Sequence, residues 1–195
     1  EHHEDLERKE VTLIENKPAG FYLEAGRFVR QRSDVGDNNG RKVMKKLEGK
    51  IAVITGGNSG IGLATADLFK TEGATVVITA RTKESFNIAK KGLGSKFDII
   101  QTDVIEMGEI ENLYKQVKSR HGKIDILFAN AGIAHFLPTE QVGEAFFDSQ
   151  FDTNVKGLYF TVAKSLPLLN QGAKVILNAS TVATKGLPGS SVYAG

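Results

Sequence analysis

One short stretch of this 195-residue chain is rich in glycine, and the spacing of its glycines is typical of a turn that binds a phosphate. Residues 55–62 read Thr-Gly-Gly-Asn-Ser-Gly-Ile-Gly, after an apolar run at 51–55 and before an amphipathic stretch at 60–71. A strand that turns sharply into a helix aims the helix's free N–H groups and positive dipole end at the space beyond the turn. We therefore expect a nucleotide diphosphate to bind here. The residues expected to contact it are Gly56, Asn58, Ser59, Gly60, Ile61 and Gly62.

Three of these glycines have separate expected tasks. Gly56 would permit the tight turn, Gly60 would let the backbone approach a pyrophosphate, and Gly62 would let the helix pack closely on the strand. A glycine-rich turn can also be a mere connection, and such a motif is weak evidence when it stands alone. Here the strand before it, the helix after it and the repeating pattern that follows favour nucleotide binding.

Short apolar, β-branched runs alternate with longer amphipathic stretches from residue 50 onward. This alternation predicts parallel strands joined by helices, and continuously apolar strands are typical of a sheet covered on both faces. The expected fold class is α/β, a doubly wound parallel sheet with helices on both faces, incomplete at the C-terminus. The expected strands are 51–55, 75–79, 97–102, 124–129 and 174–178, and the expected helices are 60–71, 83–91, 107–121 and a long one within 147–169.

Apolar residues in that last stretch recur at intervals of three or four. Side chains at this spacing share one face of a helix, so we expect them to form one buried stripe. The residues of the expected stripe are Phe151, Val155, Leu158, Val162 and Leu166.

The composition excludes several classes of partner and site. Lys and Arg number 25 and Asp and Glu 23, for a net charge of +2, which gives no electrostatic reason to expect nucleic acid or an anionic membrane. No apolar run approaches the roughly 20 residues of a membrane-spanning helix, and the first residues lack the apolar core of a secretory signal. We expect a soluble, cytoplasmic protein. The chain has no cysteine, so disulfides, thiolate zinc sites and cysteine nucleophiles are excluded.

Two stretches suggest a metal site and fail on ligand chemistry. His2 and His3 have no further ligand at metal-binding spacing. Residues 34–40 suggest a calcium loop, but the twelfth position of that loop is Lys45, where a bidentate glutamate is needed. We therefore expect no metal.

Residues 1–43 differ from the rest of the chain. They mix charges with isolated apolar residues, and residues 27–41 have almost nothing to bury, a composition typical of a flexible extension. A short strand or turn is expected at 11–14 or 21–23. The first methionine is Met44, so we expect a partial dinucleotide-binding domain over 44–195, preceded by an appendage or by translated upstream sequence.

The loop spacing T-G-x-x-x-G-x-G, with the sequence after it, resembles the short-chain dehydrogenase/reductase family in its short single-domain branch. The resemblance covers residues 44–195 and implies a Rossmann-type fold that binds NAD(P)(H). Asp103, followed by Val104, matches the family's acidic residue beside the adenine, and a turn or helix cap is the plain alternative. The family's N-A-G, which lines the cofactor cleft and steadies the central sheet, matches Asn130, Ala131 and Gly132.

Ser180 and Tyr193 lie 13 positions apart, which is the interval between the family's catalytic serine and tyrosine. Thr181 is a competing hydroxyl, one step off that interval. Reduction of a carbonyl needs a hydride on carbon, a proton on oxygen and fixed donors for the developing negative charge. The resemblance assigns the proton to Tyr193, and the orientation and polarisation of the carbonyl to Ser180. Asn154 matches the family's helix asparagine, which holds a water in the proton relay.

The residues at the end of the second expected strand, 75–79, determine which of the two nicotinamide cofactors is preferred. A carboxylate there would bind the ribose 2′-hydroxyl of NAD(H) and repel a 2′-phosphate. This chain has Ala80 and Arg81 instead, and an arginine offers a permanently charged fork to a phosphate. NADP(H) is favoured and NAD(H) stays possible, because Arg81 could be only a solvated residue at a helix start, and Ser59 lacks the basic side chain of some NADP-preferring members.

The family's Y-x-x-x-K pattern places a lysine two residues beyond Gly195. The resemblance therefore implies a fragment, inactive by itself, of a longer enzyme that interconverts a small-molecule carbonyl and alcohol and forms a homodimer or homotetramer. The fragment would leave its fifth strand as an exposed edge. The alternative is a non-catalytic dinucleotide-binding or regulatory protein of the same fold. The family's extended branch is disfavoured, because it typically spaces its loop T-G-x-x-G-x-x-G.

Overall fold

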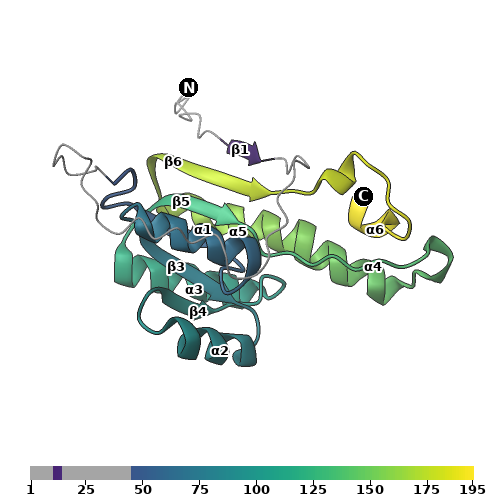
Figure 1. The fold of residues 1–195 in the computed structure, drawn as a ribbon, viewed down its shortest axis with the longest axis horizontal. Coiled ribbons are helices and arrows are strands. Elements are labelled where there is room, and N and C mark those ends of the chain that lie inside the picture. Colours follow the sequence, from purple (N-terminus) through teal and green to yellow (C-terminus); the bar gives the residue numbers. More distant parts are fainter. Residues whose placement is uncertain (1–10, 15–44) are drawn as a thin grey trace, which may run out of the picture.

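The computed structural model describes residues 11–14 and 45–195, and of residues 11–14 only the backbone. Within these residues, parallel strands form one sheet in the order β1-β6-β5-β2-β3-β4 (Figure 1). Their bounds are β1 Val11–Ile14, β2 Ile51–Ile54, β3 Thr75–Ala80, β4 Asp98–Gln101, β5 Ile124–Ala129 and β6 Leu169–Asn178.

Helices connect the strands and cover both faces of the sheet. The bounds of the main helices are α1 Gly60–Thr71, α2 Lys83–Leu93, α3 Met107–His121, α4 Glu144–Phe151, α5 Leu158–Ser165 and α6 Ser191–Ala194, with a short 3₁₀ turn η1 at Thr139–Gln141. Ala66 of α1 and Ala89 of α2 belong to the apolar cluster on one face. Leu113 of α3 belongs to the cluster on the other face, against which Phe160 of α5 packs. The predicted doubly wound α/β class is confirmed.

The chain winds in opposite directions from the middle of the sheet. From β2 it proceeds through β3 to β4, and it then crosses to the other side of β2 for β5 and β6. The carboxyl ends of a parallel sheet open a crevice at such a reversal, because the loops on its two sides diverge. The glycine-rich residues 55–59 leave β2 at this point, and residues 130–138 leave β5.

Most predicted elements lie close to their expected positions. Both α1 and α3 begin and end where expected, and α2 extends two residues further, to Leu93. β6 begins earlier than expected because its first residue also pairs with β5. Ile124 lies opposite Leu169 and Ile126 lies opposite Lys174, so an irregularity separates the two parts of this pairing.

β6 is not the exposed edge that we expected of the fifth predicted strand. β1 pairs with it in parallel, from Val11 opposite Val175 to Ile14 opposite Asn178. A short β-branched, apolar stretch can satisfy the N–H and C=O groups that a bare edge strand leaves unpaired, which is why the prediction was wrong. The short strand expected at 11–14 is present, whereas residues 1–10 and 15–44, and with them the expected turn at 21–23, lie outside the described residues.

The expected long helix within 147–169 is interrupted, and its buried face is not the expected one. Between α4 and α5 lies a π-helical turn, η2 (Asp152–Gly157), and a 3₁₀ turn, η3 (Leu166–Leu168), follows α5. Val155 and Leu166 of the expected stripe are 52% and 45% exposed. The residues buried instead are Gln150, Thr153, Gly157, Thr161 and Ser165.

Two physical causes explain this reversal. A π turn has more residues per turn than an α-helix, so it rotates the face that the following residues present. The buried residues are also mostly small, which allows a close approach of backbones. A Cβ at Gly157 would lie only 2.8 Å from Cγ2 of Val104. Close packing, rather than apolar periodicity, therefore decides which face is buried.

Asp125 ties three strands together at the amino end of the sheet. Its carboxylate accepts hydrogen bonds from the Ile51 N–H (2.9 Å) and from Asn170 Nδ2 (3.1 Å), and Lys50 Nζ lies 3.4 Å away. Burial alone would raise the pKa of Asp125. The hydrogen bonds and the Lys50 ammonium outweigh it and together hold that pKa below its ordinary value.

Replacing Asp125 by asparagine should destabilise the chain by about 1–2 kcal/mol at pH 7, because the amide would turn an N–H group toward N–H donors. A carboxyl with a depressed pKa stabilises the folded state above its unfolded-state pKa of about 3.9, and loses that contribution as pH falls through the folded-state value. Urea unfolding at pH 7 and pH 3 should therefore show the D125N variant losing less stability on acidification than the original chain. The exposed Asp148→Asn is the control, with a change below about 0.5 kcal/mol. Equal pH dependence in D125N and the original chain would contradict this account.

Candidate active site

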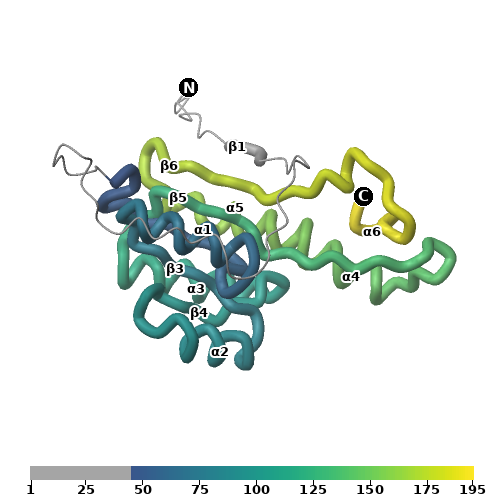
Figure 2. The backbone as a smooth tube through the Cα atoms, viewed as in Figure 1, coloured from purple at the N-terminus to yellow at the C-terminus, as the bar shows by residue number. Residues whose placement is uncertain are grey.

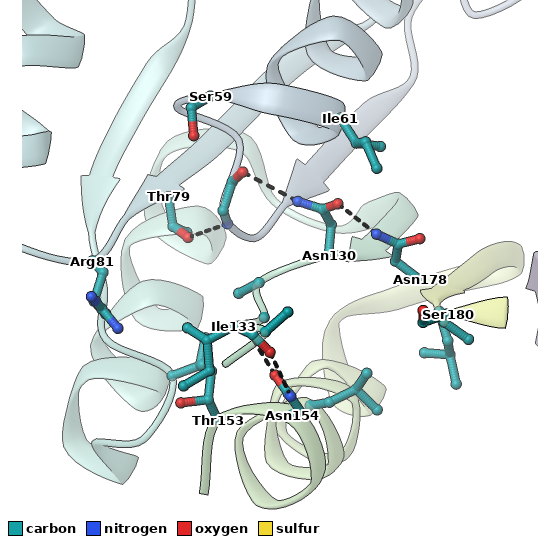
Figure 3. Close-up of a pocket in the computed structure, with 18 of the residues that line it drawn as sticks. Ser59, Ile61, Thr79, Arg81, Asn130, Ile133, Thr153, Asn154, Asn178 and Ser180 are labelled. Carbon is teal, nitrogen blue, oxygen red and sulfur yellow. Dashed lines mark hydrogen bonds between the residues drawn. The ribbon is translucent and has the colours of Figure 1, made fainter. Parts of the chain in front are cut away.

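A cavity of about 680 Å³ lies at the carboxyl ends of β2, β3, β5 and β6 (Figure 3). The structure brings most of the residues expected at a site together around it: Gly56, Asn58, Ser59, Ile61, Arg81, Val104, Asn130, Ala131, Gly132, Asn154, Ser180 and Tyr193. Gly60, Gly62 and Asp103 do not line it. Lining residues that the sequence did not single out as site residues are Thr79, Thr102, Ile133, Ala134, Thr153, Leu158, Leu177, Asn178, Ala179 and Ala183.

Residues 55–62, which we call the phosphate loop, need their glycines for two physical reasons. Gly56 has a φ of +62° and Gly60 a φ of +53°, a left-handed region that other residues rarely adopt. A Cβ at Gly62 would collide with the Gly56 carbonyl and would lie 2.7 Å from Asn130 Nδ2. α1 therefore packs directly on the turn that precedes it, which is the close packing that the spacing predicts.

The first turn of α1 is left without a side-chain cap. Ser59, the residue before the helix, makes no side-chain hydrogen bond to the first turn, and that turn carries no acidic residue. Its N–H groups and the positive end of the helix dipole are therefore available to an anion. Ser59 and Ile61 both line the cavity, so the uncapped start of α1 faces it.

Two buried threonines hold this loop from behind. Thr79, in β3, accepts a hydrogen bond at Oγ1 from the Gly56 N–H (3.1 Å). Thr55, directly after β2, accepts two at Oγ1, from the N–H groups of Asn130 (3.0 Å) and Ala131 (3.1 Å). These bonds satisfy turn N–H groups that no strand pairing reaches. Sequence reasoning missed both threonines, because the contacts join strands that become neighbours only in the folded sheet.

The end of β3 presents an arginine and no carboxylate. Ala80 is fully buried, and Arg81 is exposed and lines the cavity. Thr82, not Arg81, caps α2, because its Oγ1 accepts a hydrogen bond from the Ser85 N–H (3.1 Å). The Arg81 guanidinium is therefore not used to start the helix and is available to an anion in the cavity.

Asp103 is held in local contacts. Its Oδ1 accepts a hydrogen bond from the Ile105 N–H (3.2 Å), and its own N–H donates to Glu109 Oε2 (2.6 Å). This is the turn geometry that a short acidic side chain favours. Val104, the next residue, is buried and lines the cavity. A role for Asp103 beside an adenine stays a prediction.

Asn154 uses both ends of its side-chain amide to hold one residue of the segment after β5. Its Oδ1 accepts from the Ile133 N–H (2.9 Å) and its Nδ2 donates to the Ile133 carbonyl (2.8 Å), as Figure 3 shows. One turn earlier, Gln150 Oε1 accepts from the His135 N–H (3.1 Å). The two amides therefore fix a segment that lines the cavity. That Asn154 holds a water stays a prediction.

Ser180 and Tyr193 both line the cavity. Ser180 follows β6, and its Oγ accepts a hydrogen bond from the Val182 N–H (3.3 Å). Tyr193 lies in α6, and its ring packs edge-on against Phe136 with 5.8 Å between ring centroids. Thr181 begins the 3₁₀ turn η4 (Thr181–Ala183) and does not line the cavity. A hydroxyl and a phenol therefore share one space with the phosphate loop.

The segments that leave β5 and β6 run side by side beyond the sheet (Figure 2). The Leu137 N–H donates to the Gly189 carbonyl (2.8 Å), and Thr139 Oγ1 donates to Ser191 Oγ (3.0 Å). Together with the ring contact of Phe136, these bonds support α6 and the tyrosine that it carries. Sequence reasoning missed them because the two segments are about fifty residues apart in the chain.

Two further features can be stated for residues 45–195. No group of three or more His, Cys, Asp or Glu side chains there could hold a metal ion, and no helix there is long and apolar enough to cross a membrane. His2, His3 and the stretch 34–40 lie outside the described residues.

Comparison with known proteins places this site in a family. The family model for short chain dehydrogenase matches residues 50–195. The oxidoreductase asL5 of Sarocladium schorii is 41% identical over 152 residues, which are 77% of this chain and 61% of that protein. The 3-oxoacyl-[acyl-carrier-protein] reductase FabG of Thermotoga maritima is 33% identical over 154 residues, 76% of this chain and 63% of that protein.

Solved structures agree with the sequence relatives. A crystal structure of a short-chain dehydrogenase/reductase from Brucella melitensis superposes with a TM-score of 0.72 at 28% identity, and the match covers 78% of this chain and 65% of that one. The chain thus spans less than two thirds of the length of these relatives. With its winding order, its phosphate loop and its matched serine and tyrosine, the chain belongs to the short-chain dehydrogenase/reductase family.

Proposed function

We propose that the full-length protein, meaning this chain with whatever follows Gly195 in its reading frame, is an oxidoreductase that uses NADP(H) to interconvert a carbonyl and an alcohol on a small molecule. The observation that carries the proposal is one cavity lined by the phosphate loop, Arg81, Ser180 and Tyr193. Its walls combine an anion-binding helix end with two hydroxyl groups of different acidity. The Thermotoga relative is itself named a reductase, in line with this type of reaction.

The cavity suits a dinucleotide with a 2′-phosphate. The uncapped start of α1 offers N–H groups to the diphosphate. At the end of β3, a carboxylate would favour a free ribose hydroxyl, and this chain has Ala80 and the uncommitted Arg81 there. NADP(H) is therefore the cofactor that we propose, ahead of NAD(H).

The chemistry divides between the cofactor and the chain's own side chains. A bound nicotinamide dinucleotide supplies or accepts the hydride. Ser180 Oγ donates a hydrogen bond to the carbonyl oxygen and so orients and polarises it. Tyr193 Oη gives its proton to that oxygen during reduction and takes a proton back during oxidation. Asn154 acts through Ile133, by fixing the segment that forms the opposite wall.

We propose that a lysine lies two residues beyond Gly195, as in the family, and that the chain by itself is inactive. We also propose a homodimer or homotetramer, because Phe147, Val155 and Tyr159 expose apolar surface along α4, η2 and α5, and such surface marks an interface. The absence of cysteine suits the cytoplasm, which is where we place the protein.

Removing the Arg81 guanidinium should separate the two cofactors. In the full-length protein, R81A should weaken NADPH binding about 10- to 100-fold, because a hydrogen bond between charged groups, here to the 2′-phosphate, is worth about 1.5–3 kcal/mol. The same variant should change NADH binding less than about threefold. Titration of the cofactor's own fluorescence measures both. Lys83→Ala, an exposed cation in the first turn of α2, is the matched control and should leave the preference unchanged. Equal weakening of NADPH and NADH by R81A would remove the argument for NADP(H).

Removing either hydroxyl should reduce turnover without removing the cofactor site. Y193F and S180A should each lower kcat by about 10²–10⁴-fold, the range for a lost proton donor or a lost oxyanion donor. Cofactor affinity should stay within about threefold of the original, since the phosphate loop is untouched. T181A is the control for the competing hydroxyl, and stopped-flow and steady-state oxidation of NADPH give the rates. A larger loss in T181A than in S180A would move the assignment to Thr181.

A further inference from the structure

We propose that Asn178 is a positioning residue that ties the strand carrying Ser180 to the phosphate loop, so that dinucleotide binding and placement of the Ser180 hydroxyl depend on each other. The inference rests on the proposed function, because it concerns the same cavity. Asn178 is the last residue of β6, two positions before Ser180, and it lines the cavity.

The contact from Asn178 has a fixed direction. Asn130 Nδ2 donates to the carbonyls of Thr55 (3.1 Å) and Gly56 (3.2 Å), so both of its amide hydrogens are used on the turn after β2. Asn130 Oδ1 is therefore held facing β6 and must accept a hydrogen bond. Asn178 Nδ2 is the donor, at 3.0 Å (Figure 3). Neither amide can be turned over without setting like groups against each other.

This bond closes a row of side-chain contacts across four strand ends. On the far side of the row, the Gly56 N–H donates to Thr79 Oγ1. The row thus runs from β6 through β5 and β2 to β3, along the edge of the cavity. Gly56 takes part with both backbone groups: its carbonyl accepts from Asn130 Nδ2 and its N–H donates to Thr79 Oγ1. Figure 3 shows Thr79, Asn130 and Asn178 in this order around the cavity.

On the side of β5 and the phosphate loop, the backbone offers little to replace this bond, although on its other side Asn178 pairs with Ile14 of β1. The pairing of β6 with β5 ends with Leu177 opposite Ala129. Beyond that pair, the Asn178 amide is the side-chain link from the strand to its neighbour before the chain reaches Ser180. A displacement of residue 178 is therefore passed directly to the Ser180 hydroxyl.

The loop side of the contact has no room to adjust. A Cβ at Gly62 would lie 2.7 Å from Asn130 Nδ2, and a Cβ at Gly56 would lie 3.3 Å from it. The Asn130 amide is therefore enclosed between the phosphate loop and α1. Loss of the Asn178 donor would leave the partly buried Asn130 Oδ1 without this partner, which is costly, and we expect the Asn130 amide then to shift away from the Gly56 carbonyl. The loop that binds the diphosphate then loses its support.

The same strand provides a matched control at its other end. Asn170, near the start of β6, donates from Nδ2 to Asp125 Oδ1 of β5 (3.1 Å). It also joins β6 to β5 through one amide, and it does not line the cavity. Replacing either asparagine should lower the stability of the sheet. Only replacement of Asn178 should also weaken cofactor binding.

The experiment compares N178A and N170A in the full-length protein by thermal unfolding, NADPH fluorescence titration and steady-state kinetics. We expect both variants to lower Tm by a few degrees. N178A should weaken NADPH binding about 5- to 50-fold and lower kcat at saturating cofactor at least fivefold, while N170A should leave both within about twofold. Unchanged NADPH affinity in N178A, or the same loss in N170A, would overturn the inference.

A second variant keeps the shape of the side chain and adds a diagnostic pH dependence. N178D places a carboxylate against the Asn130 oxygen at pH 8, and protonation of the introduced carboxyl restores a donor. Because an aspartate carboxyl has an ordinary pKa of about 3.9, NADPH affinity of N178D, relative to the original protein at each pH, should recover as pH falls from 8 to 4. A constant ratio across this range would count against the inference even if N178A failed to fold. If the original protein bound neither NADPH nor NADH, the proposed function itself would fail. That outcome is distinct from the results expected for N178A and N178D, which are measured relative to an original protein that binds NADPH.

Discussion

Hydrogen bonds from two neighbouring strand ends hold the turn before α1 in place. The N–H groups of this turn and of the neighbouring turn after β5 are satisfied by Thr79 and Thr55, and its carbonyls by Asn130. Backbone groups at a strand end are costly when they are buried without partners, so these side chains decide the shape of the loop as much as its glycines do. The start of α1, by contrast, has no side-chain cap.

The opposite wall of the cavity depends on close packing. Small buried residues in η2 and α5, with the rotation introduced by the π turn, bring Gly157 against Val104. This places Gln150 and Asn154 where their amides reach the backbone of His135 and Ile133. A regular helix with an apolar stripe would have buried larger side chains and kept these amides away from the segment that lines the cavity. The π turn therefore serves the site, as such turns often do.

The sequence predicted what depends on local chemistry and missed what depends on strand order. The glycine turn between β2 and α1 and the bounds of α1 and α3 follow from glycine spacing and helical periodicity, and the structure agrees with them. The buried stripe was wrong because periodicity cannot reveal a π turn. The roles of Thr79 and Asn178 could not be predicted, because their partners lie on strands that only the fold brings together. The pairing of β1 with β6 is non-local in the same way, since more than 150 residues separate Val11 from Val175.

Tyr193 takes its position from outside its own helix. α6 has four residues, too few to be stable by themselves, and the segment after β5 supports it through the Leu137 N–H bond to the Gly189 carbonyl and the edge-on ring of Phe136. That same segment is fixed at Ile133 by Asn154. The phenol is therefore connected to the π turn through a continuous row of contacts, just as Ser180 is connected to the phosphate loop through Asn178. An asparagine amide thus lies in each of the two rows of contacts, Asn154 in the row that leads to Tyr193 and Asn178 in the row that leads to Ser180, and the sheet reversal between β2 and β5 brings the two rows to the same space.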